Sequence, residues 1–127
     1  MLQNNLREKV GKYMPETLIH DTIKRFTHPW FRYFLEYNPA TDLRKVQCPV
    51  LAITGEKDIQ ASPKQNLPAI QKALESGGNR NFVIRELPGL NHLFQNAGTG
   101  SVSEYIEIEE TIAPIALETI SGWILRQ

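Results

Sequence analysis

The sequence predicts an α/β fold in which two parallel strands are joined through a helix. Residues 50–53 form an unbroken apolar run between Pro49 and Gly55. A run without polar alternation is typical of a strand that is covered on both faces, as in a parallel sheet. A helical stretch and a second apolar segment, residues 81–87, follow. Because parallel strands need a long crossover connection, this order predicts one right-handed βαβ unit.

The residues before the first strand are predicted to be helical, from about Leu2 to Phe34. Apolar side chains recur every three or four positions there, and Pro15 and Pro29 divide the stretch into three helices. The third helix carries a dense aromatic run: Trp30, Phe31, Tyr33, Phe34 and Tyr37. The pattern favours a core patch and leaves open the wall of a substrate pocket.

Between the two strands, a helix is predicted from Ser62, a candidate N-cap followed by Pro63, to about Glu75. Asn66 marks a second possible start, and the glycines of residues 76–79 end the helix. After the second strand we expect a polar, flexible loop over residues 96–104 and an extended or irregular segment over residues 105–108. A last amphipathic helix is predicted from about residue 111 to the carboxyl terminus.

The composition of the chain argues against several classes of function. The chain has 127 residues, 41% of them hydrophobic, which is enough for one small domain with a core. Lys plus Arg and Asp plus Glu number 14 each, so neither nucleic acid nor an anionic membrane is an expected partner. No apolar run is long enough to span a bilayer, and the amino terminus is too polar for a signal peptide. The sequence does not define the cellular compartment, and the cytoplasm is taken as the default.

Chemistry-bearing residues follow both strands. Gly55 ends the first apolar run, and Asp58 stands just past it, at the predicted carboxyl end of the strand. His92 follows the Pro88-Gly89 turn after the second strand. Because the carboxyl ends of parallel strands meet at one edge of the sheet, Asp58 and His92 are expected to be neighbours. The Asp can then orient the imidazole and stabilise its protonated form while the His acts as a general base.

Such a pair needs a nucleophile, normally a serine within Gly-x-Ser-x-Gly. No serine of the chain stands in that frame; the serines considered are Ser62, Ser76, Ser101, Ser103 and Ser121. A metal site at Glu56, Asp58 and His92 lacks the close spacing of such sites, so neither a metal nor another cofactor is expected. The only cysteine, Cys48, excludes an internal disulfide and is interpreted as a small buried residue at the strand entrance.

These segments resemble the carboxyl-terminal part of an α/β-hydrolase, in the branch of esterases and prolyl-oligopeptidase-like peptidases. Residues 48–58, Cys-Pro-Val-Leu-Ala-Ile-Thr-Gly-Glu-Lys-Asp, resemble that family's penultimate core strand and acid turn. Residues 87–94, Leu-Pro-Gly-Leu-Asn-His-Leu-Phe, resemble its histidine loop, and the end of the last helix, Gly-Trp-Ile at 122–124, resembles its closing helix.

The resemblance implies that residues 38–127 form the carboxyl-terminal part of a hydrolase core, with the last two parallel strands of its sheet. Residues 1–37 resemble a cap or lid segment only loosely. Asp58 would be the acid of the catalytic triad and His92 its base. Trp30, Phe31 and Phe94 are the candidates for substrate binding. In the parent protein, the substrate would be a small-molecule ester or a peptide.

The chain also departs from the family, since it lacks the nucleophile elbow, the oxyanion-hole loop and most of the sheet. We therefore expect it to be inactive alone, as a piece of a longer hydrolase, a truncated reading frame or a fragment adapted to binding. The first strand would present an open apolar edge, which predicts self-association, most simply a homodimer. The alternative is a non-catalytic module that binds a partner through the aromatic segment from Trp30 to Tyr37.

Overall fold

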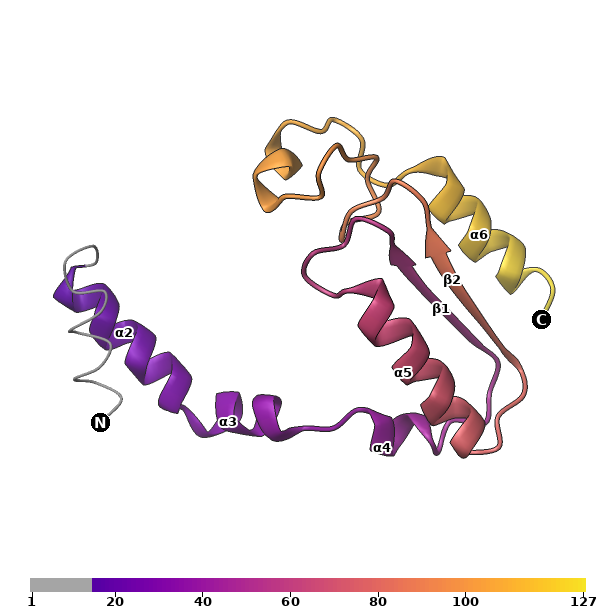
Figure 1. Cartoon of the computed structure of the whole chain (residues 1–127), viewed down its shortest axis with the longest axis horizontal. Coiled ribbons are helices and arrows are strands. Elements are labelled where there is room, and N and C mark those ends of the chain that lie inside the picture. Colours follow the sequence, from indigo (N-terminus) through magenta and orange to yellow (C-terminus); the bar gives the residue numbers. More distant parts are fainter. Residues whose placement is uncertain (1–14) are drawn as a thin grey trace. The chain divides into compact units, whose positions relative to one another are not determined.

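The computed structural model describes residues 15–127. Contacts divide the chain into two compact units, Met1–Asn38 and Pro39–Gln127. The first predicted helix, from Leu2 to about residue 14, lies outside the described residues. The described part is a mixed α/β structure with a two-stranded parallel sheet and flanking helices, as the sequence predicted (Figure 1).

The first unit contains helices α2 (Glu16–Thr27) and α3 (Pro29–Glu36). Both begin where the prolines predicted, with Pro15 just before α2 and Pro29 as the first residue of α3. His28 separates them, and its ring nitrogen Nδ1 accepts a hydrogen bond from the Trp30 N–H (3.2 Å). This bond satisfies one of the amide groups that every helix leaves unpaired at its start.

The aromatic run of α3 is not a core patch, so the favoured interpretation was wrong. The Trp30 side chain is 64% exposed, and Tyr33, Phe34 and Tyr37 are also exposed. These rings pack on one another along the helix: Trp30 stacks on Phe34 with centroids 5.7 Å apart, and Tyr33 lies 5.8 Å from Tyr37. Spacings of four residues place these pairs on one face, but that face is open to solvent.

The second unit holds the sheet and most of the helices. Its elements are, in chain order, α4 (Ala40–Leu43), β1 (Val50–Gly55), α5 (Pro63–Ser76), β2 (Phe82–Leu87), the 3₁₀ helix η1 (Val102–Ile106) and α6 (Pro114–Ile124). The segment 105–108, expected to be extended or irregular, contributes two residues to η1, because the Ser101 hydroxyl accepts a bond from Ser103 N–H and starts a helical turn.

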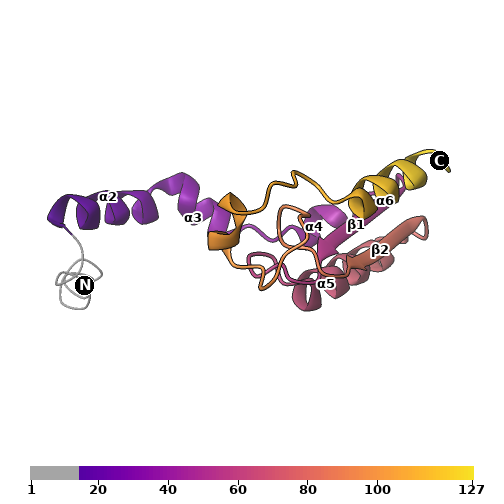
Figure 2. The same cartoon turned by 90° about the horizontal axis from the view of Figure 1, so that it is seen from above.

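The strands pair in parallel, with Val50 opposite Phe82 and Gly55 opposite Leu87. Helix α5 connects them and packs on both, which completes the predicted βαβ unit. Helix α6 lies on the opposite side of the sheet from α5 (Figures 1 and 2). Ser62 occupies the position before α5 as expected, but its side chain makes no capping hydrogen bond.

Strand β1 is less covered than the sequence predicted. Residues 50–53 are half-buried rather than covered on both faces. Only β2 pairs with β1 among the described residues, so the second edge of β1 has no neighbouring strand. Cys48, predicted to be buried, is exposed at the strand entrance.

The best-packed region lies at the carboxyl end of the sheet. Leu87, Leu90, Ala113 and Ala116 are buried there, and Ile53 and Phe94 pack against them. The loop after β2 is thus fixed between the end of the sheet and the start of α6. None of the helices within residues 15–127 is long and apolar enough to cross a membrane.

Candidate active site

The candidate site is built on the turn after β1, residues 55–58. The turn is held against the loop after β2 by backbone bonds from Glu56 N–H to Leu87 C=O (2.9 Å) and from Lys57 N–H to Leu90 C=O (2.8 Å). A Cβ on Gly55 would overlap the Leu90 carbonyl oxygen and lie 2.5 Å from that of Asn91. Only glycine lets the two backbones approach this closely.

The side chains of Glu56 and Lys57 then fix two further segments. The Glu56 carboxylate accepts a hydrogen bond from Gly89 N–H (2.7 Å). The Lys57 ammonium donates to the carbonyl oxygens of Ala97 (2.6 Å) and Gly98 (2.9 Å). One short turn therefore anchors both the loop that carries His92 and the loop that leads to η1.

Asp58 and His92 are in direct contact, as the parallel topology predicted. The imidazole Nδ1 lies 2.8 Å from the Asp58 oxygen Oδ2. The other carboxylate oxygen, Oδ1, accepts hydrogen bonds from the N–H groups of Gln60 (2.9 Å) and Ala61 (2.8 Å). The Asp58 side chain is 4% exposed and the His92 side chain 42%. A buried, fully engaged carboxylate thus holds one side of an imidazole whose other side is accessible.

The surroundings of Asp58 favour its ionised form. Burial acts to raise the pKa of this carboxyl group, but the hydrogen bonds from Ala61, His92 and Gln60 and the charge of His92 act against it. Together they lower the pKa of Asp58 below its ordinary value of 3.8. At neutral pH the carboxylate is therefore charged and accepts the Nδ1 proton of the imidazole.

A network of polar side chains orders the loop from residue 97 to η1. The Glu104 carboxylate accepts bonds from the hydroxyl and N–H of Thr99 and from Gly100 N–H. These bonds, that of the Thr99 hydroxyl first, lower the pKa of Glu104. Tyr105 accepts a hydrogen bond from the Gln60 side chain (2.7 Å). The loop predicted to be flexible is thus tied to the same turn that carries Asp58.

The residues proposed for substrate binding line apolar grooves. Phe94, at the end of the histidine loop, packs against the core and lines a groove of about 540 Å³ along β1. The other residues of this groove are Leu51, Ala52, Ile53, Ile70, Ile120, Trp123 and Ile124. Trp30 and Phe31 belong to the first unit, where they line a groove of about 390 Å³ with residues of α2. The role of these three residues in substrate binding stays a prediction.

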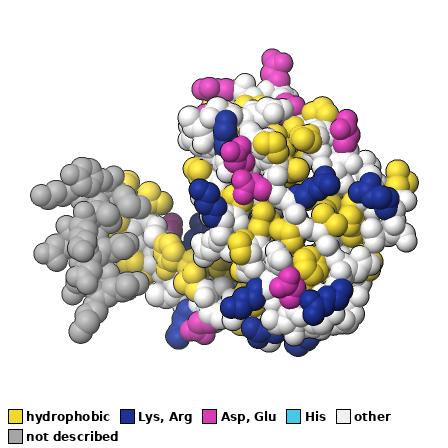
Figure 3. Space-filling view, turned by 45° about the vertical axis from the view of Figure 1, so that its right-hand side comes forward, with side chains coloured by type: hydrophobic (Ala, Val, Ile, Leu, Met, Phe, Trp, Pro, Cys, Tyr) yellow, Lys and Arg dark blue, Asp and Glu magenta, His cyan; other side chains and the backbone are white. Residues whose placement is uncertain are grey.

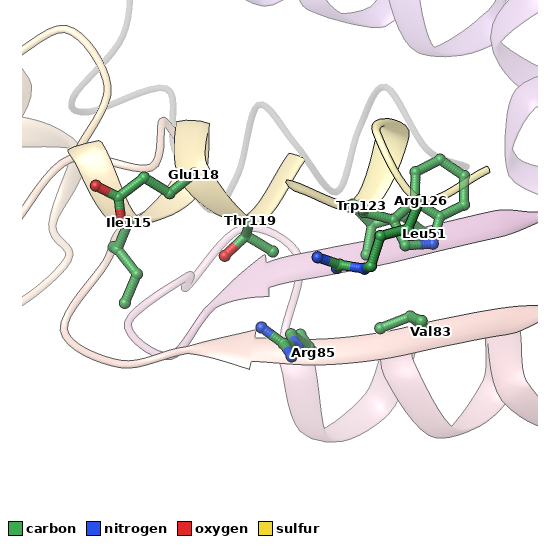
Figure 4. A pocket seen from close by; sticks show the side chains of 8 residues that line it. All are labelled: Leu51, Val83, Arg85, Ile115, Glu118, Thr119, Trp123 and Arg126. Carbon is green, nitrogen blue, oxygen red and sulfur yellow. The ribbon is translucent and has the colours of Figure 1, made fainter. Parts of the chain in front are cut away.

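The second unit has another groove, of about 300 Å³, between α6 and the sheet (Figure 4). Leu51, Val83 and Arg85 form its strand side, and the helix side consists of Ile115, Glu118, Thr119, Trp123 and Arg126. Hydrophobic side chains also lie open among charges of both signs on the face shown in Figure 3. The sheet is therefore incompletely covered, in contrast to its carboxyl end.

No role was predicted for Asn91, Lys57 or Glu104, yet all three side chains form hydrogen bonds that order the loops of the site. Asn91 carried a usable signal, because Asn next to a turn often bonds the backbone two residues on. Lys57 carried none, since its partners are backbone carbonyl groups about 40 residues further along the chain. Glu104 bonds to Thr99 and Gly100, which are close in sequence but form no pattern that we used.

Within residues 15–127, no group of three His, Cys, Asp or Glu side chains could hold a metal ion. Comparisons with protein-family models, curated proteins and solved structures found no match to this chain.

Proposed function

We propose that this chain is the carboxyl-terminal part of a serine hydrolase of the α/β-hydrolase type, which acts as a whole on ester or peptide bonds. In this proposal Asp58 is the triad acid and His92 the triad base. One observation supports it most: the Asp58–His92 hydrogen bond at the carboxyl edge of two adjacent parallel strands. Open α/β sheets place their chemistry at this edge.

The geometry suits proton transfer at the second ring nitrogen. Since Nδ1 carries its proton toward Asp58, the Nε2 atom of the neutral imidazole has a free lone pair. Among the described residues, no hydrogen bond engages Nε2. It can accept a proton from a serine hydroxyl, and the ionised Asp58 then stabilises the imidazolium that forms.

The nucleophile has to come from outside this set of residues. None of the serines in the described part of the chain bonds to His92; Ser101 and Ser103, for example, bond to each other (2.8 Å). Without a nucleophile and an oxyanion hole the chain retains the acid–base pair only. We therefore propose that it is inactive alone.

The experiment compares the full 127-residue chain with the His92→Ala and His20→Ala variants. Hydrolysis of p-nitrophenyl acetate should show no burst, and a fluorophosphonate probe should label no serine. A free imidazole hydrolyses this ester slowly, so His20→Ala, which removes an exposed histidine of the first unit, corrects for that background. Probe labelling or turnover that only His92→Ala abolishes would mean that the chain has its own nucleophile, and the proposal would fail.

A positive test uses a longer chain that includes the sequence encoded upstream. That sequence should contain Gly-x-Ser-x-Gly, and the longer protein should react with the fluorophosphonate probe. Replacing His92 by Ala should reduce labelling at least a hundredfold, since general-base catalysis contributes about 10²–10⁴-fold. An upstream sequence without a serine in this frame would contradict the proposal.

We further propose that the chain self-associates through the open edge of β1. The N–H groups of Val50 and Glu56 point to β2, where they bond to Asn81 and Leu87. Because backbone groups alternate along a strand, those of Leu51 and Ile53 point to the opposite, open edge. Two copies can pair these edges antiparallel around a two-fold axis, forming a homodimer.

Sedimentation of the chain at micromolar concentration tests this proposal. Leu51→Pro removes an outward N–H and should weaken the dimer at least tenfold, whereas Leu51→Ala controls for the lost side chain. Ala52→Pro removes an N–H that faces β2 and should unfold the sheet instead. A monomer at all concentrations would refute self-association and leave the hydrolase proposal unaffected.

The alternative function is a non-catalytic binding module, and the exposure of the aromatic run favours it. Solvent-exposed, mutually stacked rings such as Trp30 and Phe34 are common in protein interfaces. This alternative predicts that Trp30→Ala abolishes partner binding while His92→Ala leaves it unchanged. The hydrolase proposal predicts instead that His92→Ala abolishes the activity of the longer protein.

A further inference from the structure

The position of His92 depends on the backbone that carries it. Its ring makes one hydrogen bond, to Asp58, and its side chain is 42% exposed, so packing restrains it little. The residue before it, Asn91, is in contrast completely buried. An amide in such a place has to be hydrogen-bonded, and its partners show what it holds.

The Asn91 side chain bonds to the residues that follow His92. Its oxygen accepts hydrogen bonds from the N–H groups of Leu93 (2.9 Å) and Gln95 (3.0 Å), and its amide group donates to the Gln95 side-chain oxygen (2.9 Å). The Asn91 N–H also bonds to the Gln95 carbonyl (3.0 Å). These bonds close a tight loop, with His92 as its first inner residue.

The loop is tied in turn to the segment before α6. The Gln95 amide donates to the Glu110 carbonyl oxygen (2.9 Å), and the Phe94 carbonyl accepts from Ala113 N–H (2.8 Å). Phe94 has a φ of 59°, a left-handed conformation that side chains other than glycine adopt at a cost. The Asn91 bonds on either side of it offset that cost.

We infer that Asn91 is a positioning residue for His92, which fixes the loop so that Nδ1 faces Asp58. This inference deepens the proposed function and rests on it. No other side chain replaces Asn91 well. An apolar one leaves the buried Gln95 N–H and the partly buried Leu93 N–H unpaired, and Asp buries a charge and loses the bond to the Gln95 oxygen. Asn91 acts through His92 and touches no substrate.

The imidazole ¹⁵N spectrum of the full chain, labelled at histidine, tests this inference without requiring activity. In the unmodified chain, His92 should be the Nδ1–H tautomer with a low-field proton. Asn91→Ala should reduce the population of this tautomer at least fivefold, because the ring then leaves Asp58. Asn96→Ala is the matched control, since the Asn96 side chain bonds only to Glu110; it should leave the spectrum unchanged.

The outcomes separate this inference from the proposed function. If His92 lacks the Nδ1–H signature in the unmodified chain, the acid–histidine pair itself fails. If the signature persists in Asn91→Ala while the amide spectrum of the sheet is intact, the positioning inference fails and the pair stands. If Asn91→Ala unfolds the sheet, the Gln95→Met variant is measured instead. It removes one partner of Asn91 and should lower the population of the Nδ1–H tautomer about twofold. An unchanged population would overturn the inference.

Discussion

The carboxyl end of the sheet and its open flank differ sharply in how well they are packed. At the carboxyl end of the sheet, the core is buried, the turn of residues 55–58 fits against the histidine loop, and no buried side-chain polar atom within residues 15–127 lacks a partner. Along the open edge of β1 and beneath α6, in contrast, apolar side chains line grooves. The same strand contributes to both regions.

The difference bears on the proposal that the chain is part of a longer hydrolase. The site end needs nothing further to hold Asp58 against His92, since every contact that orients the pair comes from residues 55–113. The open flank has the half-buried strand and uncovered helix face expected where more sheet is missing. The contrast is what we expect if the chain is, as proposed above, part of a larger fold.

The largest effect is expected from Gly55→Ala, at the centre of the complete region. The new Cβ would overlap the Leu90 carbonyl and push the histidine loop from the turn. We expect the free energy of unfolding to fall by about 3 kcal/mol, at the upper end for overpacking. Urea unfolding measures it.

Gly122→Ala is the matched control, because Gly122 lies in α6 with only the Arg126 side chain near its Cβ position. The same substitution should stabilise the chain there by roughly 0.5–1 kcal/mol, as for glycine in a helix interior. Equal effects at the two positions would contradict the close fit of the turn.

The next effect is expected from Asp58→Asn, which removes the charge from three hydrogen bonds. At pH 7 it should destabilise the chain by about 1–3 kcal/mol. Because folding lowers the pKa of Asp58 below 3.8, the charged carboxylate stabilises the fold above that pH, and this contribution is lost as the pH falls through the folded pKa. The difference between the two chains should therefore shrink in acid. Urea unfolding from pH 7 to pH 2 measures it, and a difference independent of pH would contradict the electrostatic origin.

A smaller and more local effect is expected from Lys57→Met. It removes the bonds to the carbonyl groups of Ala97 and Gly98 but keeps the aliphatic stem. We expect a loss of about 1 kcal/mol, with faster amide hydrogen exchange in residues 97–108 and unchanged exchange in the strands. Lys64→Met, on exposed α5 surface, is the control and should change neither. Faster exchange throughout the sheet would show that Lys57 supports the whole unit.

Much of the site could be predicted because it follows from local signals and topology. Pro49 and Gly55 delimit the strand, and the order strand–helix–strand alone brings Asp58 and His92 to one edge. That step needs no knowledge of side-chain packing. The start of α5 at Pro63 was predictable for the same reason, since proline fits the first turn of a helix.

The errors concern burial, which a sequence pattern indicates only indirectly. The apolar run at residues 50–53 is typical of a buried strand, and the aromatic run of α3 is typical of a core patch; both are partly or largely exposed. Both runs consist of residue types that are common in buried segments, but the described part of the chain does not bury them. The role of Lys57 depends on carbonyl groups that are distant in sequence, and such contacts leave no periodic signal.

The smallest effect is expected from Leu51→Ala, in the open region. Leu51 is half-buried and borders both grooves, so truncation removes few contacts and creates no closed cavity. We expect a loss below about 1 kcal/mol, compared with at least about 2 kcal/mol for Leu90→Ala, where a fully buried side chain leaves a cavity in the core. Urea unfolding of both variants, at protein concentrations too low for dimerisation, measures the two losses in unfolding free energy. Equal losses would mean that the flank is packed as tightly as the site end, and the contrast between the two regions would disappear.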